Sequence, residues 1–252
     1  MSVTDAEPVV VITGASGGIG AALATELGRR HATVVLVARR PEALARVAEG
    51  CGPRAEVIVA DMTRRDEVRR VVEAALARCG RIDVWVNNVG QGITRNPSEL
   101  TDADIDAMVR VNVKSALYGM QAIVPYFQAR GAGQVITVSS TLGRIPHRVF
   151  RVAYNGAKHF LNALVANYRD EVAVTHPGIA FSLVSPGAVR TDFGANARHG
   201  GPLSTELADA QAPEEVARVI ADLVESRRRD VYTRRGSRER VVQYYAGLGE
   251  DP

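Results

Sequence analysis

The chain has 252 residues, of which 46% are hydrophobic and 23% charged, and its formal net charge is +3. This composition fits one soluble globular domain, residues 1–252, with a sizeable core. Acidic and basic residues are interspersed without a long basic block, so the positive charge does not indicate nucleic-acid binding.

Targeting and metal-binding signals are also missing from the sequence. Residues 1–8 lack the basic start and apolar centre of a signal peptide, and no apolar run is long enough to cross a bilayer. Cys51 and Cys79 have no metal-ligand spacing, and we expect them to be free thiols in a reducing cytosol. The sequence therefore predicts a cytoplasmic protein with no metal site and no membrane partner.

A glycine-rich turn at residues 13–20 lies between an apolar run and a helical pattern. The run at 8–13 is continuously hydrophobic, as is typical of a strand buried on both faces of a parallel sheet. Glycines let the backbone approach a ligand, and the N–H groups at the start of a helix attract an anion. We interpret the turn as a diphosphate site, although a turn without a ligand has the same composition. Its expected cofactor residues are Gly14, Ser16, Gly18, Ile19 and Gly20.

The second predicted strand, 33–37, ends in Ala38, Arg39 and Arg40. In a dinucleotide-binding fold an acid at this point bonds the 2′-hydroxyl of the adenosine ribose. Two arginines stand here instead, and a guanidinium presents a fork of donors that suits a phosphate. The sequence therefore favours NADP(H) over NAD(H), the alternative being two solvated arginines at the start of a helix.

The next two predicted strands add further candidate cofactor residues where each ends. Strand 56–60 is followed by an acid that can reach the adenine amine, and strand 82–86 is followed by an asparagine pair. Such a pair usually bonds neighbouring loops and can also line a cofactor. From these two edges we expect Asp61, Met62, Asn88 and Gly90 to contact the cofactor.

Tyr154 and Lys158 are four residues apart on a predicted helix, which places both side chains on one face. An ammonium beside a phenol favours the phenolate and lowers its pKa from about 10. Ser140, which follows strand 134–138, can hold a carbonyl oxygen within reach of that phenol. These residue types predict a site that moves a proton to or from an oxygen.

The remaining elements alternate between helices and strands. A long helix at 109–130 contains Asn112, a polar residue among apolar ones that needs bonding partners. Residues 192–212 have the composition of a mobile lid, and we expect residues 1–7 and the basic tail 234–252 to be poorly ordered. The alternation predicts a single-domain doubly wound Rossmann fold, with a mostly parallel seven-stranded sheet and helices on both faces.

In order along the chain, these motifs resemble the short-chain dehydrogenase/reductase family over about residues 9–232. The motifs that carry the resemblance are Thr-Gly-x-x-x-Gly-x-Gly at 13–20, Asp61, Asn-Asn-x-Gly at 87–90, Asn112, Ser140, Tyr154-x-x-x-Lys158, and Pro186-Gly187 with Thr191. Each motif is weak alone, but the full set in register is specific.

The resemblance implies a role for each matching residue. Tyr154 would be the general acid in reduction and the base in oxidation, and Lys158 would lower its pKa and bond the nicotinamide ribose. Ser140 would orient the substrate oxygen, and Asn112 would hold a water that passes protons on. Pro186, Gly187, Val189 and Thr191 would line the cofactor, the last two at the nicotinamide carboxamide. The family also implies a homodimer or homotetramer, in agreement with the broad apolar faces of helices 109–130 and 155–170.

Two positions depart from the family pattern. Val89 replaces the usual alanine of the asparagine motif, which places a bulkier side chain towards the adenosine. Ser140 and Tyr154 are 154 − 140 = 14 residues apart, one more than is usual, so Ser139 remains an alternative for Ser140.

The substrate region gives a less specific signal. Arg144, His147, Arg148 and Arg151 precede Tyr154, and Arg95 and Arg190 lie on other loops of the same edge. These residues are compatible with an anionic substrate or an acidic carrier protein, but a solvated loop in an arginine-rich chain is the preferred interpretation.

The leading interpretation is an NADP(H)-dependent reductase or dehydrogenase acting on a small carbonyl or alcohol. A non-catalytic sensor of the nicotinamide redox state is the alternative, and the intact set of candidate catalytic residues argues against it. A nucleotide-sugar epimerase or dehydratase is a third possibility, which the family associates with a longer C-terminal substrate domain.

Overall fold

The computed structural model describes residues 7–249. Seven strands form one sheet in the order β3-β2-β1-β4-β5-β6-β7, and every neighbouring pair is parallel. The predicted doubly wound Rossmann fold is confirmed, with a sheet that is wholly rather than mostly parallel. The strands are β1 (Val9–Thr13), β2 (Thr33–Ala38), β3 (Ala55–Val59), β4 (Val84–Asn87), β5 (Gly133–Val138), β6 (Ile179–Ser185) and β7 (Asp230–Tyr232).

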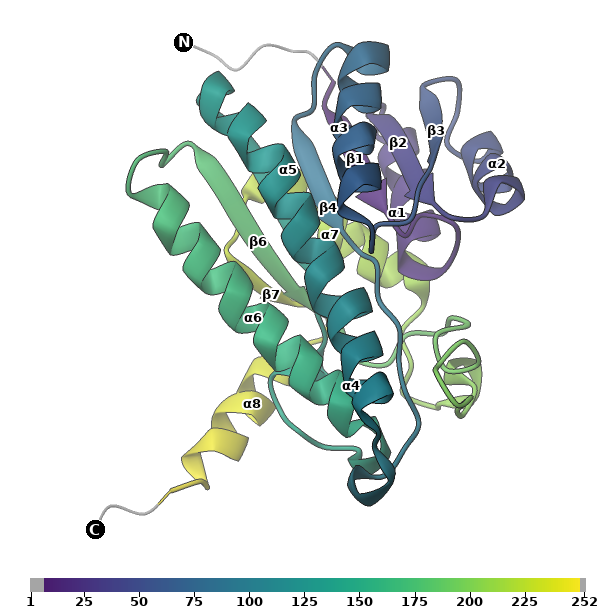
Figure 1. Cartoon of the computed structure of the whole chain (residues 1–252), viewed down its shortest axis with the longest axis vertical. Coiled ribbons are helices and arrows are strands. Elements are labelled where there is room, and N and C mark those ends of the chain that lie inside the picture. The colour runs from purple at the N-terminus through teal and green to yellow at the C-terminus, as the bar shows by residue number, and fades with distance from the viewer. Residues whose placement is uncertain (1–6, 250–252) are drawn as a thin grey trace.

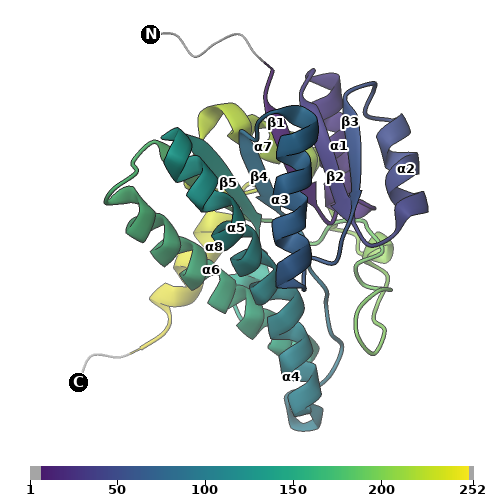
Figure 2. The same cartoon turned by 45° about the horizontal axis from the view of Figure 1, so that its top comes forward.

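Helices cover both faces of this sheet (Figures 1 and 2). Helices α3, α5 and α6 pack in one hydrophobic layer, and α1, α2 and α7 pack in the other. The helices are α1 (Gly18–Arg29), α2 (Pro41–Glu49), α3 (Arg65–Cys79), α4 (Asp102–Val109), α5 (Ser115–Arg130), α6 (Val152–Ala173), α7 (Pro213–Ser226) and α8 (Ser237–Ala246).

Strand β1 shows why its apolar run has no polar alternation. Val9 and Val11 belong to the core under α3, α5 and α6, whereas Val10 and Ile12 belong to the core under α1 and α7. Successive side chains of a strand point to opposite faces, so a strand covered on both faces must be apolar at each position.

Helices α4 and α5 form one continuous helix through a wide π turn at Arg110–Lys114. Thr101 caps its start, because its hydroxyl accepts from the Asp104 backbone N–H at 3.3 Å. The sequence predicted a long helix from 109, whereas the structure begins the continuous helix at Asp102. Asn112 lies within the π turn, a feature that often occurs at functional sites.

The C-terminal segment differs from the sequence-based expectation. Residues 234–252 were expected to be irregular, yet Ser237–Ala246 form α8, which extends away from the sheet (Figure 1). The side chain of Ser237 is buried, and the Tyr245 hydroxyl donates to the Arg144 carbonyl at 2.7 Å. These contacts hold α8 to the loop before α6. Residues 1–6 and 250–252, also expected to be poorly ordered, lie outside the described residues.

Within residues 7–249 no helix combines the length and the hydropathy that crossing a bilayer requires. Cys51 and Cys79 are both free thiols, as expected.

Candidate active site

The glycine turn after β1 is shaped by two backbone conformations that favour glycine. Gly14 has φ +69° and Gly18 has φ +55°, both in the left-handed region. A Cβ added to Gly20 would lie 2.4 Å from the Gly14 carbonyl oxygen, so α1 can start against the turn only with glycine there. The predicted strand, turn and helix are therefore present in the predicted order.

The start of α1 has the features of an anion site. No side chain caps the helix, and Gly17 and Gly18 are exposed while Ser16 and Ile19 are half-buried. Uncapped N–H groups at a helix N-terminus attract a phosphate. The residues here thus fit the diphosphate of a dinucleotide.

Arg40 is the arginine that reaches back to the glycine turn. Its Nη2 donates to Ser16 Oγ at 3.3 Å, and its guanidinium is exposed. Arg39 is also exposed, and the contact with Ser16 belongs to Arg40. The sequence assigned the 2′-phosphate first to Arg39, with Arg40 able to share it, whereas in the structure Arg40 is the one that contacts the turn.

Asn88 holds the end of β4 to the glycine turn. Its Nδ2 donates to the carbonyl oxygens of Thr13 and Gly14 at 3.1 and 3.2 Å. Asn88 thus bonds a neighbouring loop, which is one of the two roles that the sequence allowed for it. These bonds place Asn88 directly behind the glycine turn. Asp61 Oδ1 accepts from the Thr63 N–H and hydroxyl, which organises the loop before α3. The side chain of Met62 beside it is buried.

Thr191 brings the loop after β6 to the same edge. Its methyl group would lie 3.2 Å from a Cβ at Gly18, so the turn and residues 186–191 face one another. The Pro186 carbonyl accepts from the Thr141 N–H at 2.8 Å, and Val189 is buried and bridged to Gln211. Gly187 lies between them, with nothing within 4 Å of an added Cβ.

Asn112 is fully buried and bonds the loop after β4. Its Nδ2 donates to the Gln91 and Met108 carbonyls at 3.0 and 3.1 Å, and its Oδ1 accepts from the Gln91 N–H at 3.1 Å. A Cβ at Gly90 would lie 3.2 Å from that Oδ1 and 3.6 Å from Lys158 Nζ. Gly90 therefore separates Asn112 from Lys158 without a side chain between them.

Ser140, not Ser139, faces Tyr154. The Ser140 hydroxyl lies near enough to Tyr154 to lower the pKa of the phenol, and its Oγ accepts from the Leu142 N–H at 3.1 Å. Ser139 Oγ instead donates to Asn162 Oδ1 at 2.5 Å, in the packing between β5 and α6. The extra residue between Ser140 and Tyr154 is accommodated in two short 3₁₀ turns, Thr141–Gly143 and Val149–Arg151.

The electrostatics of Tyr154 and Lys158 differ from the sequence-based expectation. Burial raises the pKa of Tyr154 to about 12, against smaller lowering effects of the Ser140 hydrogen bond and the Arg151 charge. Burial also lowers the pKa of Lys158 to about 7. The ammonium nitrogen lies 5.7 Å from the Tyr154 ring centroid and donates to the Val138 carbonyl at 3.0 Å. The expected lowering of the phenol pKa is therefore wrong for this arrangement, because desolvation outweighs the nearby charges.

The buried Lys158 predicts a pH-dependent stability. Its folded pKa of about 7 lies below the usual 10.5, so between these values the unfolded chain binds a proton that the folded chain does not. Stability from this group therefore rises with pH across that window. We expect Lys158→Met to flatten the rise and to increase the melting temperature at pH 7. Thermal unfolding between pH 7 and 10 measures this effect, with the exposed Lys114→Met as control; an unchanged pH slope in Lys158→Met would contradict it.

Residues 192–201 cover the site. The Phe193 ring packs against the Tyr154 ring at 5.4 Å and 62°. The covering segment is tied to the loop after β4 by a β-bridge between Ile93 and Arg198. Tyr154 is consequently buried, with 6% of its surface exposed.

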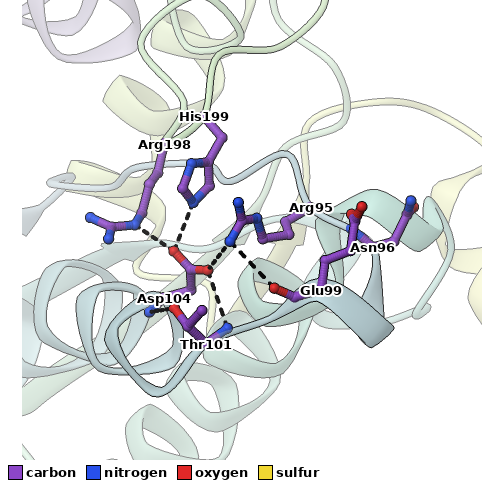
Figure 3. A network of polar contacts seen from close by, with 7 residues as sticks. All are labelled: Arg95, Asn96, Glu99, Thr101, Asp104, Arg198 and His199. Atoms are coloured by element: carbon purple, nitrogen blue, oxygen red, sulfur yellow. Dashed lines mark hydrogen bonds and ion pairs between the residues drawn. The ribbon is translucent and has the colours of Figure 1, made fainter.

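Asp104 fastens this cover from below (Figure 3). The carboxylate is fully buried and accepts from Arg198 Nε at 2.6 Å, His199 Nε2 at 2.8 Å and Arg95 Nη1 at 3.3 Å. Bonds from His199 and Arg198 hold the pKa of Asp104 well below its usual range. The Thr101-x-x-Asp104 pattern indicates a helix start, but not these partners, which lie up to 95 residues away in the chain.

We expect Asp104→Asn to loosen the cover. The change removes the charge that pairs Arg95 and Arg198 and leaves both guanidinium groups without their acidic partner, which destabilises the folded chain. The melting temperature should fall and the substrate KM should rise. Asp102→Asn, an exposed residue in the same first turn, is the matched control; equal effects of the two variants would rule out a specific role for Asp104.

The wholly parallel, doubly wound sheet and the glycine turn at an uncapped helix define a nucleotide-binding α/β protein. The chain belongs to the short-chain dehydrogenase family, whose model matches residues 8–201. It is 34% identical over 197 residues to an uncharacterized oxidoreductase of Staphylococcus epidermidis, covering 75% of this chain and 83% of that protein.

Solved structures agree with this assignment. A metagenomic short-chain oxidoreductase in complex with NADP is 33% identical, with a TM-score of 0.74 over 89% of this chain and 96% of that one. A Burkholderia phymatum short-chain dehydrogenase/reductase in complex with NAD superposes with a TM-score of 0.87 over 100% of this chain and 99% of the other. At 20% identity the second likeness shows the shared fold alone.

Proposed function

We propose that the protein is an NADP(H)-dependent oxidoreductase that interconverts a carbonyl and an alcohol. The observation that carries this proposal is the buried Tyr154 side chain beside the buried Ser140, at the sheet edge that also holds the glycine turn. Ligands of open α/β sheets bind at this carboxyl edge, so a nicotinamide bound there would lie near Tyr154 and Ser140.

The residues around the turn would hold the cofactor. The start of α1 would receive the diphosphate, Arg39 and Arg40 the 2′-phosphate, and Asp61 the adenine amine. Lys158 would bond the nicotinamide ribose, and the loop after β6 would border the nicotinamide ring. When bound, NADP(H) supplies or accepts the hydride, while the protein supplies placement and electrostatics.

Tyr154 would transfer the proton. With its pKa raised to about 12, the phenol stays protonated across the physiological range and can donate to a carbonyl oxygen during reduction. Ser140 would orient that oxygen, and Asn112 would keep the loop after β4 in place beside Lys158. Alcohol oxidation needs the phenolate, which this environment disfavours.

The redox-sensor alternative makes a different prediction from the enzyme. Purified protein would be mixed with NADPH and a panel of ketones, aldehydes, quinones and 3-oxoacyl thioesters, and absorbance of the reduced nicotinamide followed with time. Consumption with any carbonyl compound supports the oxidoreductase. Tight NADPH binding without consumption across the panel would favour the sensor.

We also propose a cytoplasmic homo-oligomer that pairs through α5 and α6. Phe160 on α6 is 55% exposed and presents a large apolar surface. From the sequence, the apolar face of this helix was expected to be broader than packing against one sheet face requires. Sedimentation at micromolar concentration should give a dimer or tetramer, and Phe160→Asp should shift it towards monomer. Val242→Asp, an exposed apolar residue on α8, is the control. A wild-type protein that sediments only as a monomer would refute the assembly.

A further inference from the structure

The arginines that the sequence placed around the substrate region differ in their bonding partners. Arg144 pairs with Asp230 at 2.5 Å and Arg95 pairs with Asp104 at 3.3 Å, so acidic partners already neutralise both. Arg190 lies on the loop after β6 and bonds the Ala210 carbonyl at 2.6 Å. Arg151 differs from these arginines, because its side chain is buried and no acidic side chain pairs with it in the described residues.

Only 8% of the Arg151 surface is exposed, and its Nη1 donates to the Ile93 carbonyl at 3.0 Å. Within residues 7–249 no carboxylate forms an ion pair with it, and burial lowers its pKa. A guanidinium carries five donors, and burying one without an anion is unfavourable. The fold therefore maintains a positive charge whose donors are largely unused by the protein.

The surroundings of Arg151 leave room for its guanidinium. A Cβ on Gly92 would lie 2.7 Å from Nη1, and one on Gly201 would lie 3.0 Å from Nη2. The same Cβ on Gly201 would lie 2.7 Å from Thr94 Oγ1, so the guanidinium and this hydroxyl border one glycine. Thr94 Oγ1 is buried and has no hydrogen-bond partner in the described structure. Two polar groups without full partners thus converge at the same place.

This place adjoins the reacting group. Arg151 precedes α6 and stands three residues before Tyr154, close enough for its charge to act on the phenol. Phe193, which packs on the Tyr154 ring, would also lie 2.9 Å from a Cβ on Gly92, beside Arg151. Arg151 and Thr94 therefore lie under the same cover as the Tyr154 hydroxyl.

We propose that Arg151, together with Thr94, binds a carboxylate of the substrate, so that the enzyme acts on oxo acids and hydroxy acids in preference to their neutral analogues. This inference rests on the proposed function and names its substrate class. A guanidinium fork matches a carboxylate in geometry as well as charge, and the Thr94 hydroxyl adds a third donor.

The test compares oxo acids of increasing chain length with their methyl esters, each with NADPH. Esterification removes the charge and keeps the ketone, so the acid-to-ester ratio of kcat/KM isolates recognition of the carboxylate. We expect wild-type enzyme to favour the acid by about 10- to 100-fold at the best chain length. Arg151→Gln should abolish this preference, mainly by raising KM for the acid. The acid-to-ester ratio cancels any change that the lost charge causes at Tyr154, because that change affects both substrates alike.

Three variants serve as comparisons. Arg151→Lys should retain part of the preference, since it keeps the charge but loses the fork. Thr94→Val should reduce it by a smaller factor. Arg148→Gln, an exposed neighbour, should leave it unchanged.

Each outcome of these measurements supports or overturns the carboxylate site at Arg151. Equal use of acids and esters by the wild type would overturn the carboxylate site, and this result needs no variant to fold. If kcat/KM falls equally for the acid and the ester in folded Arg151→Gln, Arg151 does not bind the carboxylate and only supports the loop that contains Ile93. If no carbonyl compound of either kind consumes NADPH, the proposed function itself fails, whereas ester reduction without acid preference rules out only the carboxylate site at Arg151.

Discussion

Tyr154→Phe is expected to lower turnover by about 10²–10⁴-fold, the usual contribution of a general acid or base. The substitution removes only the hydroxyl that carries the transferable proton and keeps the ring that packs against Phe193 at 5.4 Å. Cofactor affinity should therefore change little. Steady-state NADPH oxidation and a binding titration on the same preparation measure the two effects separately.

Tyr168→Phe is the matched control for this substitution. Tyr168 lies on the same helix α6 but packs against Phe181, in the core and away from Ser140. Its loss of a hydroxyl should leave kcat/KM unaffected. Near-normal turnover by Tyr154→Phe would eliminate the proton-transfer role of Tyr154.

The raised pKa of Tyr154 also predicts how the two directions respond to pH. The protonated phenol serves reduction, so the Tyr154 contribution to reduction should stay constant until pH approaches 12. The phenolate serves oxidation, and its fraction rises tenfold per pH unit below that pKa. Initial rates of both directions between pH 7 and 10 measure this, and a pH-independent oxidation rate would contradict it.

The sequence predicted the parts of the site that depend on local spacing. The interval between Tyr154 and Lys158 fixes a shared helix face, and the glycines at 13–20 fix a turn, whatever lies around them. The signs of the pKa shifts could not be predicted in this way. They depend on how completely the cover excludes water from Tyr154, which is set by Phe193 packing from a distant segment.

The contacts that the sequence did not predict also join residues that are far apart in the chain. Asp104 meets Arg198 across 94 residues, and no local pattern links the two. The interval between Arg40 and Ser16 is 24 residues, and only the folded turn shows that Arg40 is the arginine beside the phosphate site. Helix α8 was missed because its basic, polar composition resembles a solvated tail until its contact with Arg144 is known.

The cofactor preference has the second largest expected effect. No acid follows β2 to accept the ribose hydroxyls of NAD, whereas Arg39 and Arg40 stand exposed at that point. A charge-assisted hydrogen bond to a 2′-phosphate contributes about 1.5–3 kcal/mol. NADPH should therefore bind more tightly than NADH by about one to two orders of magnitude.

The two arginines should contribute unequally. Arg40 already lies over the glycine turn, with Nη2 at 3.3 Å from Ser16 Oγ, so Arg40→Ala should lose more of the preference than Arg39→Ala. The double variant should lose nearly all of it. Ala38→Asp combined with Arg39→Ala should favour NADH, because the change adds an acceptor for the ribose hydroxyls and removes a phosphate partner.

Paired titrations with NADPH and NADH at fixed pH and two salt concentrations test the assignment. Both guanidinium groups are exposed, so raised salt should weaken NADPH binding more than NADH binding. Arg46→Ala, in the last turn of α2, controls for a general loss of positive charge. Equal dissociation constants for the two cofactors in the wild type would falsify the phosphate role of Arg39 and Arg40. The proton-transfer chemistry of Tyr154 would survive that result, because it depends on the nicotinamide end, which the two cofactors share.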